Sequence, residues 1–198
     1  MSKFRGGSRR RILRGFAAVS IAACAVLPTI VNAQGPVVRL IVPFPAGGPA
    51  DAMARVLVDK LKDELKQNVI VDNRPGASTR LAAEMLKNSN PDGNTVLLTL
   101  LDTMVIAPMV YANLRYDPDK DFAPITEVAA VNFCMAVSET SPYRSVSDYV
   151  KAAKSNQTAA SLGVASGLGT VPHFLAFDLA KASKTDLSVV PFQGGGAW

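Results

Sequence analysis

Apolar and polar residues follow two alternating patterns along the chain, one typical of strands and one typical of helices. Residues 37–44, VVRLIVPF, form a β-rich apolar run that predicts a strand. From Pro49 to Leu65, apolar residues recur three and four positions apart, and most charged residues fall on the other face. This spacing predicts an amphipathic helix. The pattern therefore begins with a strand, a glycine-containing turn and a helix.

The same order recurs towards the C-terminus. Further strands are predicted at residues 68–73, 95–101, 160–166 and 187–192, and further helices at residues 78–88, 145–154 and 170–183. Ser145 with Asp148 three positions later is typical of a capped helix start. Strands that alternate with helices predict an α/β fold with a largely parallel sheet and helices on both faces.

Residues 103–140 are less regular. Their apolar runs at 122–129 and 131–138 are interpreted as strands that cross between two lobes. Cys134 lies in the second run, where we expect a buried, inert thiol.

The first 33 residues differ in composition from the rest. They hold six basic side chains and no acid, then an apolar stretch at 15–31 and a small-residue cleavage site before Gln34. This pattern predicts a cleaved signal peptide at 1–33 and export to the periplasm. A membrane anchor is disfavoured because Pro28 interrupts a stretch shorter than the ~20 residues of a spanning helix. A twin-arginine route and a lipid anchor at Cys24 stay open as weaker alternatives.

The net charge of +5 does not indicate a nucleic-acid partner, because residues 34–198 hold 15 basic against 16 acidic side chains. His173, the one histidine, falls inside a predicted helix, and no nucleophile elbow accompanies it. Phosphate-loop motifs and metal-ligand spacings are also missing from the sequence. We therefore expect no enzyme activity, no metal and no cofactor.

Four turns that follow strands share a character: residues 44–51, 73–79, 165–170 and 192–196 are rich in Gly and in small or hydroxyl side chains. Such turns gather at the carboxyl edge of an open α/β sheet, where N–H groups at helix starts favour an anion. Tight turns in any α/β protein also need Gly, so this interpretation stays open. Asp51 is either a helix-start acid or a contact for a ligand amine or an ordered water.

Several ordered motifs resemble one family. FPAGGPAD at 44–51, VDNRPGA at 71–77, PDGNTVLL at 91–98, YDPDKDFAPIT at 116–126 and VVPFQGGG at 189–196 look like the signatures of Bug-type receptors, the periplasmic substrate-binding proteins of tripartite tricarboxylate transporters. The resemblance implies a fold like that of type II periplasmic binding proteins, with two α/β lobes around a cleft. The lobes are expected at 34–127 and 128–198, the second being incomplete because the family runs further than Trp198. A truncated product is expected.

The resemblance also implies a monomeric receptor that captures a small carboxylate and delivers it to membrane transporter subunits. The residues expected at the ligand are Phe44, Pro45, Ala46, Gly47, Gly48, Asp51, Ser78, Asp102, Thr103, Ser166, Gly167, Gly169 and Thr170.

The family usually continues PGAGG after the second strand, whereas this chain has Gly76-Ala77-Ser78-Thr79. It also departs from the family pattern at Asp102, where a turn rich in Gly, Ser or Thr is usual. A carboxylate at Asp102 would repel an anion, so an amino-acid-like or neutral ligand stays open. The alternative functions are an exported α/β enzyme that acts on a small acid, a sensor partner, and a truncated fragment that binds nothing.

Overall fold

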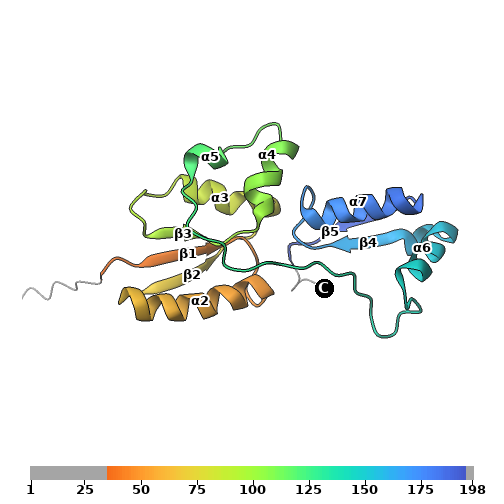
Figure 1. Cartoon of the computed structure of the whole chain (residues 1–198), viewed down its shortest axis with the longest axis horizontal. Coiled ribbons are helices and arrows are strands. Elements are labelled where there is room, and N and C mark those ends of the chain that lie inside the picture. The colour runs from red at the N-terminus through yellow and green to blue at the C-terminus, as the bar shows by residue number, and fades with distance from the viewer. Residues whose placement is uncertain (1–34, 195–198) are drawn as a thin grey trace, which may run out of the picture. The chain divides into compact units, whose positions relative to one another are not determined.

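The computed structural model of the chain describes residues 35–194. The predicted signal peptide and Cys24 lie outside this range, as do the last residues of the fourth glycine turn. In the described part, β1 (Val38–Val42), β2 (Val69–Asn73) and β3 (Thr95–Leu97) form a parallel sheet in the order β2-β1-β3 (Figure 1). Arg39 of β1 lies opposite Ile70 of β2 and Thr95 of β3. The predicted parallel α/β arrangement is confirmed.

Helices α2 (Pro49–Leu65) and α3 (Arg80–Lys87) cover opposite faces of this sheet (Figure 1). The strand order explains why. The chain passes from β1 to its neighbour β2 through α2. It then returns through α3, past β1, to β3, which is the other neighbour of β1. Connections between parallel strands are almost always right-handed, so two connections that run in opposite directions across a sheet place their helices on opposite faces.

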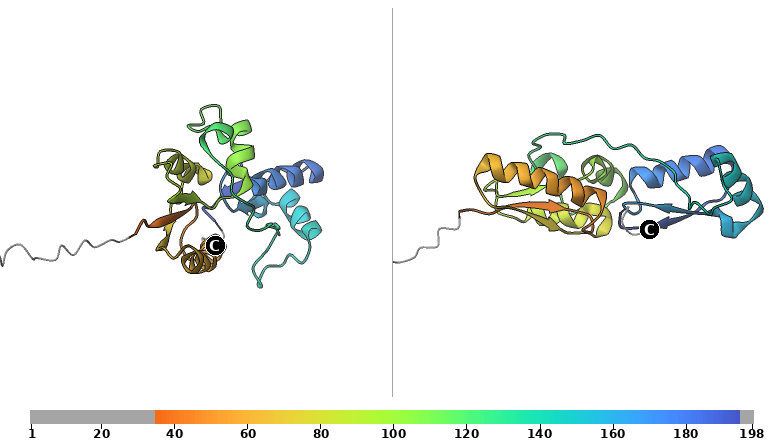
Figure 2. Two further views of the ribbon diagram at one scale, coloured as in Figure 1. Left: turned by 60° about the vertical axis from the view of Figure 1, so that its left-hand side comes forward. Right: turned by 90° about the horizontal axis from the view of Figure 1, so that it is seen from below.

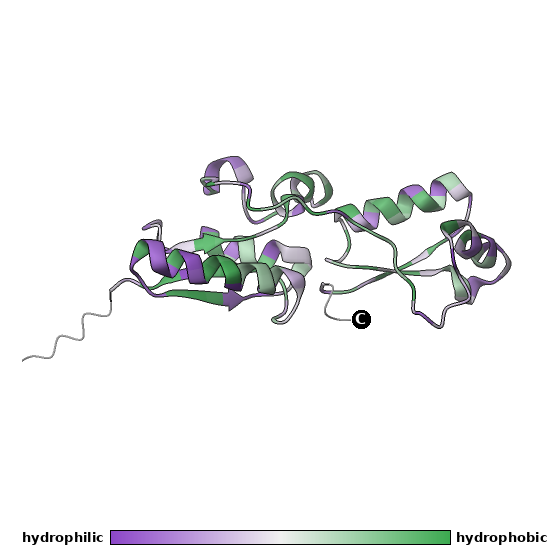
Figure 3. Ribbon diagram, turned by 60° about the horizontal axis from the view of Figure 1, so that its bottom comes forward, coloured by the Kyte–Doolittle hydropathy of each residue, from purple (hydrophilic) through white to green (hydrophobic). Residues whose placement is uncertain are grey.

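The main hydrophobic core lies between α2 and the sheet. Apolar side chains of β1 and β2 pack against the inner face of α2, while the polar side of that helix faces outwards (Figure 3). The buried members of this core are Val38, Leu40, Val42, Phe44, Ala54, Val58 and Val69. Burying each large aliphatic side chain contributes roughly 1.5–3 kcal/mol, so this core holds α2 and the turn before it against the sheet.

The helix predicted from Pro49 to Leu65 is confirmed in full. Gly48 is its N-cap, Pro49 occupies the first helical position, and Lys66 ends it in a left-handed conformation. Proline suits the first position because its missing N–H would have no intrahelical partner there.

Two predicted elements are shorter than expected. The helix expected at 78–88 is a 3₁₀ turn, η2 (Ala77–Thr79), followed by α3. The strand expected at 95–101 ends at Leu97, because β3 pairs only with β1 and β1 itself ends at Val42. The chain then enters a π-helical turn, η3 (Asp102–Ile106), and the short helices α4 (Ala107–Val110) and α5 (Pro118–Asp121).

A second, two-stranded parallel sheet follows towards the C-terminus. It comprises β4 (Ser161–Val164) and β5 (Ser188–Pro191), joined by α7 (Val171–Ser183). Before it come α6 (Val146–Ser155) and the 3₁₀ turn η4 (Gln157–Ala160). The predicted cap of α6 is confirmed, since the backbone N–H of Asp148 donates to Ser145 Oγ at 3.1 Å.

The two strands predicted within residues 122–138 are wrong. Between α5 and α6 the chain runs as an extended segment without a partner strand, as both views in Figure 2 show. Residues 123–140 are all exposed, and so is Cys134, which we expected to be buried. An apolar segment forms a strand only where a neighbouring strand pairs with its backbone N–H and C=O groups. No strand of the described residues pairs with this segment.

Among residues 35–194, no helix has the length and apolarity needed to cross a membrane.

Candidate functional site

The loops that follow β1 and β3 start from neighbouring strands. Residues 43–48 connect β1 to α2, and residues 98–101 connect β3 to η3 and α4 on the other side of the sheet (Figure 1). Adjacent strands whose following loops diverge to opposite faces form the switch point at which open α/β sheets bind ligands. The first sheet therefore places Phe44–Gly48 and Asp102–Thr103, two groups of predicted site residues, at this point.

Asp51 organises the turn after β1. Its side chain is buried, and its oxygens accept hydrogen bonds from the backbone N–H of Gly47 at 2.9 Å, from Arg55 Nε at 2.8 Å and from Asn73 Nδ2 at 3.0 Å. The hydrogen bond from Arg55, followed by that from Gly47, lowers the pKa of Asp51 from 3.8 to about 2, although burial opposes this change. Asn73 also donates to the carbonyl of Phe44 at 3.1 Å, so the turn is held from both α2 and β2.

The turn after β2 adopts an unusual backbone conformation. Ala77, Ser78 and Thr79 have φ values of 49°, 50° and 73°, in the left-handed region that favours glycine. Here the chain keeps a glycine-like backbone without glycine, and Ser78 and Thr79 stand where the family pattern has glycines. Backbone strain of this kind concentrates at ligand clamps and other functional positions.

A chain of hydroxyl groups connects this turn to the one after β3. Thr103 Oγ1 lies 2.6 Å from Thr79 Oγ1 and 2.7 Å from Thr99 Oγ1, and both Thr79 and Thr103 are buried. The carbonyl of Thr103 also accepts a hydrogen bond from Tyr116 Oη at 2.5 Å. Burial raises the pKa of Tyr116 to about 12, so its hydroxyl stays a donor at neutral pH.

The turn after β4 has the same left-handed character. Ser166, Gly167 and Gly169 have φ values of 70°, 85° and 74°, and Thr170 Oγ1 donates to the carbonyl of Gly167 at 2.8 Å. His173, in the first turn of α7, accepts a hydrogen bond on Nδ1 from the backbone N–H of Gly169 at 3.2 Å. The histidine therefore supports the shape of this loop.

The turns of the two sheets contact one another. Asp102 Oδ2 accepts a hydrogen bond from the N–H of Val171 at 3.0 Å, and Tyr111 Oη donates to the carbonyl of Leu168 at 2.8 Å. Gly167 lies against Ser78, since a Cβ on this glycine would be 2.4 Å from Ser78 Oγ. Residues from both halves of the predicted site thus lie together in the structure.

The turn after β5 also reaches this region. A Cβ placed on Gly194 would be 3.5 Å from Phe44 Cδ1 and 3.6 Å from Pro45 Cδ. Phe44 itself belongs to the buried core beneath α2, and Ala46 is exposed at the tip of its turn.

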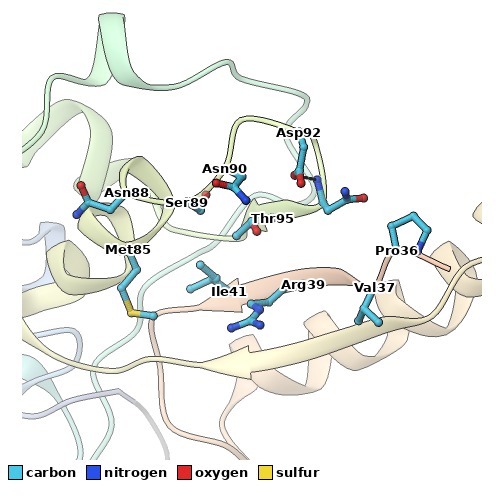
Figure 4. Close-up of a pocket in the computed structure, with 11 residues that line it drawn as sticks. Pro36, Val37, Arg39, Ile41, Met85, Asn88, Ser89, Asn90, Asp92 and Thr95 are labelled. Carbon is cyan, nitrogen blue, oxygen red and sulfur yellow. Dashed lines mark hydrogen bonds between the residues drawn. The ribbon is translucent and has the colours of Figure 1, made fainter. Parts of the chain in front are cut away.

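Two hollows in the described residues lie away from the predicted site. One, shown in Figure 4, is lined by Arg39, Ile41 and Met85, together with residues at the amino ends of β1 and β3. The other lies beside α4 and α5. Neither is lined by any of the 13 predicted site residues.

Sequence reasoning missed three residues that shape this region: Asn73, Thr79 and Tyr111. Asn73 carried a usable signal, because a polar residue that ends a strand lies at the carboxyl edge of the sheet. Tyr111 carried none, because it contacts Leu168 across 57 positions of the sequence. Its ring also lies beneath the guanidinium of Arg80, 3.3 Å from the ring centroid.

Comparison with known proteins agrees with these observations. Residues 53–197 match the model of the tripartite tricarboxylate transporter family receptor. The chain belongs to this family. A relative from Pseudomonas sp. (strain P51), described as a UPF0065 protein in the tcbD-tcbE intergenic region, is 30% identical over 186 residues, which cover 94% of this chain and 55% of the relative. The chain thus spans about half the length of the curated relatives it matches.

Solved structures agree with the receptor fold. R. palustris Rpa4515 with adipate is 30% identical, with a TM-score of 0.73 over 79% of this chain and 52% of that one. MatC from Rhodopseudomonas palustris with bound malate is 28% identical, with a TM-score of 0.63 over 80% of this chain and 53% of that one. The periplasmic binding protein BugD is 27% identical, with a TM-score of 0.66 over 80% and 52%. The expected type of fold is therefore confirmed, and the chain covers about half of each complete protein.

Proposed function

We propose that this chain acts as an extracytoplasmic solute-binding receptor that captures a small carboxylate in the periplasm for a tripartite tricarboxylate-type transporter in the membrane. The observation that carries this proposal is the family match over residues 53–197. Two structural neighbours hold adipate and malate, which supports a small carboxylate as the class of ligand. Because the chain spans about half of those proteins, its own binding activity is part of the proposal.

The proposed ligand site is formed by the turns at the carboxyl ends of β1, β2, β3 and β4. It comprises the 13 residues expected from the sequence, with Asn73 and Thr79 as supports of the first two turns. Residues 34–127 form the proposed first lobe, and residues 128–198 form part of the second. Ligand binding would favour the arrangement in which the two sets of turns approach one another, because the ligand contacts both only there.

The proposed function requires binding without turnover by a monomer, and no cofactor, metal or nucleic acid takes part. Isothermal titration calorimetry of the purified chain against adipate, malate and a set of amino acids tests it. Saturable heat with the ligand recovered unchanged supports a receptor. Formation of product would instead support an exported enzyme acting on a small acid. Absence of binding, in a chain that circular dichroism shows to be unfolded, would support a non-binding fragment.

A matched pair of variants locates the site. Ser166→Gly removes a hydroxyl at a left-handed position among the proposed contacts, and Lys184→Gly relieves a similar conformation, φ 51°, at the C-terminal end of α7. Glycine adopts both conformations without strain, so neither variant should lose stability. Ser166→Gly should weaken ligand binding by about tenfold, the equivalent of one lost hydrogen bond, while Lys184→Gly should leave it unchanged. Equal affinities in the two variants would argue against a site at Ser166.

A further inference from the structure

Asp102 lies at the switch point between β1 and β3, and its side chain points to the helix of the other sheet. The residue is 6% exposed, and its Oδ2 accepts a hydrogen bond from the N–H of Val171, the first residue of α7. A carboxylate in this position satisfies a free N–H of α7 and neutralises the positive end of the helix dipole. The protein thus has its own carboxylate at a helix start, the kind of position where an anion is favoured.

In the turn before α2, a carboxylate of the chain also accepts a hydrogen bond from a backbone N–H. The N–H of Gly47 is donated to Asp51, a buried carboxylate from the first turn of α2. Arg55, the basic side chain nearest to this carboxylate, is already hydrogen-bonded to it. A carboxylate of the chain therefore holds the turn that leads into α2, and another caps the start of α7. A ligand that placed a negative group beside Asp102 would meet a like charge in a poorly solvated position.

We propose that Asp102 determines the charge of the ligand. The inference rests on the proposed receptor function and narrows its ligand class to compounds with one carboxylate and a neutral or cationic group on the side of Asp102. Dicarboxylates should bind more weakly. A cationic group could pair with the free lone pairs of Asp102, whereas a second carboxylate could not. This chain would then differ in ligand charge from the neighbours that hold adipate and malate.

The test compares three six-carbon probes that differ only at one end: adipate, 6-aminohexanoate and hexanoate. Calorimetry of the wild-type chain should show at least about tenfold tighter binding of 6-aminohexanoate or hexanoate than of adipate, the effect of one close like charge. This comparison needs no variant, so it stands whether or not substitutions at Asp102 disturb folding.

Asp102→Asn removes the charge and keeps an oxygen that can accept from Val171. It should raise the affinity for adipate by about tenfold and lower that for 6-aminohexanoate, whose cationic group then has no carboxylate to pair with. Asp59→Asn is the control, because it removes the same charge from an exposed position on α2 whose side chain is 78% accessible. It should change none of the three affinities.

Two outcomes would overturn the inference while leaving the receptor function intact: a wild-type preference for adipate, or equal effects of Asp102→Asn and Asp59→Asn. Failure of every probe, and of the wider ligand set, to bind any form of the chain would instead contradict the receptor function and the inference with it.

Discussion

Gly167 lies against the side chain of Ser78, so closely that a Cβ on the glycine would be 2.4 Å from Ser78 Oγ and 3.2 Å from Ser78 Cβ. The two residues belong to turns of different sheets, and both have left-handed backbones. Their contact brings the turn after β2 against the turn after β4. Glycine is required at 167 for two separate reasons, backbone conformation and lack of space.

Substitution of Gly167 separates these two reasons. Gly167→Ala should destabilise the chain by about 1 kcal/mol through its positive φ and by roughly 1–3 kcal/mol more through the clash with Ser78. Gly93→Ala is the matched control, because Gly93 has φ +79° and a Cβ added there would have nothing within 4 Å. Gly93→Ala should lower the free energy of unfolding only by the contribution of positive φ, about 1 kcal/mol. Urea unfolding of both variants measures the difference.

A second substitution tests whether Ser78 is the cause. In a Ser78→Gly background, the cost of Gly167→Ala should fall to that of Gly93→Ala, because the hydroxymethyl group that occupies the space is gone. An undiminished cost in this background would show that the two turns do not meet through these residues.

Ala77 offers a way to measure the strain in the turn after β2. Its side chain is exposed and its φ is 49°, so Ala77→Gly removes a strained conformation at the loss of one methyl group. The relief of about 1–2 kcal/mol exceeds the extra chain entropy of glycine, so the variant should be more stable by about 0.5–1 kcal/mol. Ala52→Gly, at an exposed position of α2, should instead destabilise by about 1 kcal/mol. A loss of stability in Ala77→Gly would contradict the strained conformation.

The pH dependence of stability should report the hydrogen bonds of Asp51. Its pKa is about 2 in the folded chain and 3.8 in the reference state, so the unfolded chain binds more protons between these values. The stabilisation from Asp51 is therefore present above about pH 4 and lost as the pH falls towards 2. Asp51→Asn should flatten this part of the curve of unfolding free energy against pH.

Urea unfolding followed by circular dichroism at several pH values measures that slope. Asp59→Asn serves as the control, because it removes the same charge from an exposed carboxylate of α2 that makes only a surface ion pair with Lys62. If Asp51→Asn kept the wild-type slope, the hydrogen bonds from Arg55, Gly47 and Asn73 would not form in solution as they do in the structure.

The exposed position of Cys134 predicts an accessible thiol in place of the buried one expected from the sequence. In a Cys24→Ser background, alkylation of the folded chain by iodoacetamide should proceed within about tenfold of its rate in urea, because the reagent reaches the exposed thiol in both states. The rate is followed by mass spectrometry. Protection by several orders of magnitude would show that residues 131–138 are covered in solution.

The sequence by itself determined the elements whose signals are local. Helix α2 begins at Pro49 and α6 is capped by Ser145, because a cap and a helical period involve residues within a few positions of one another. The order of strands and helices, the turns rich in small residues and the family motifs were equally readable. They led to the receptor family, which the comparison confirms.

Only the tertiary structure decided which of these residues meet. Asp102 and Val171 are 69 positions apart, and Tyr111 and Leu168 are 57 apart, so no local pattern could pair them. Residues 122–138 show the converse, since their apolar pattern predicted strands but the described chain offers them no partner. A strand needs a partner strand, and the start of α7 is capped by Asp102 from another element. In both cases the partner is distant in sequence, so packing rather than local preference decides whether the two meet.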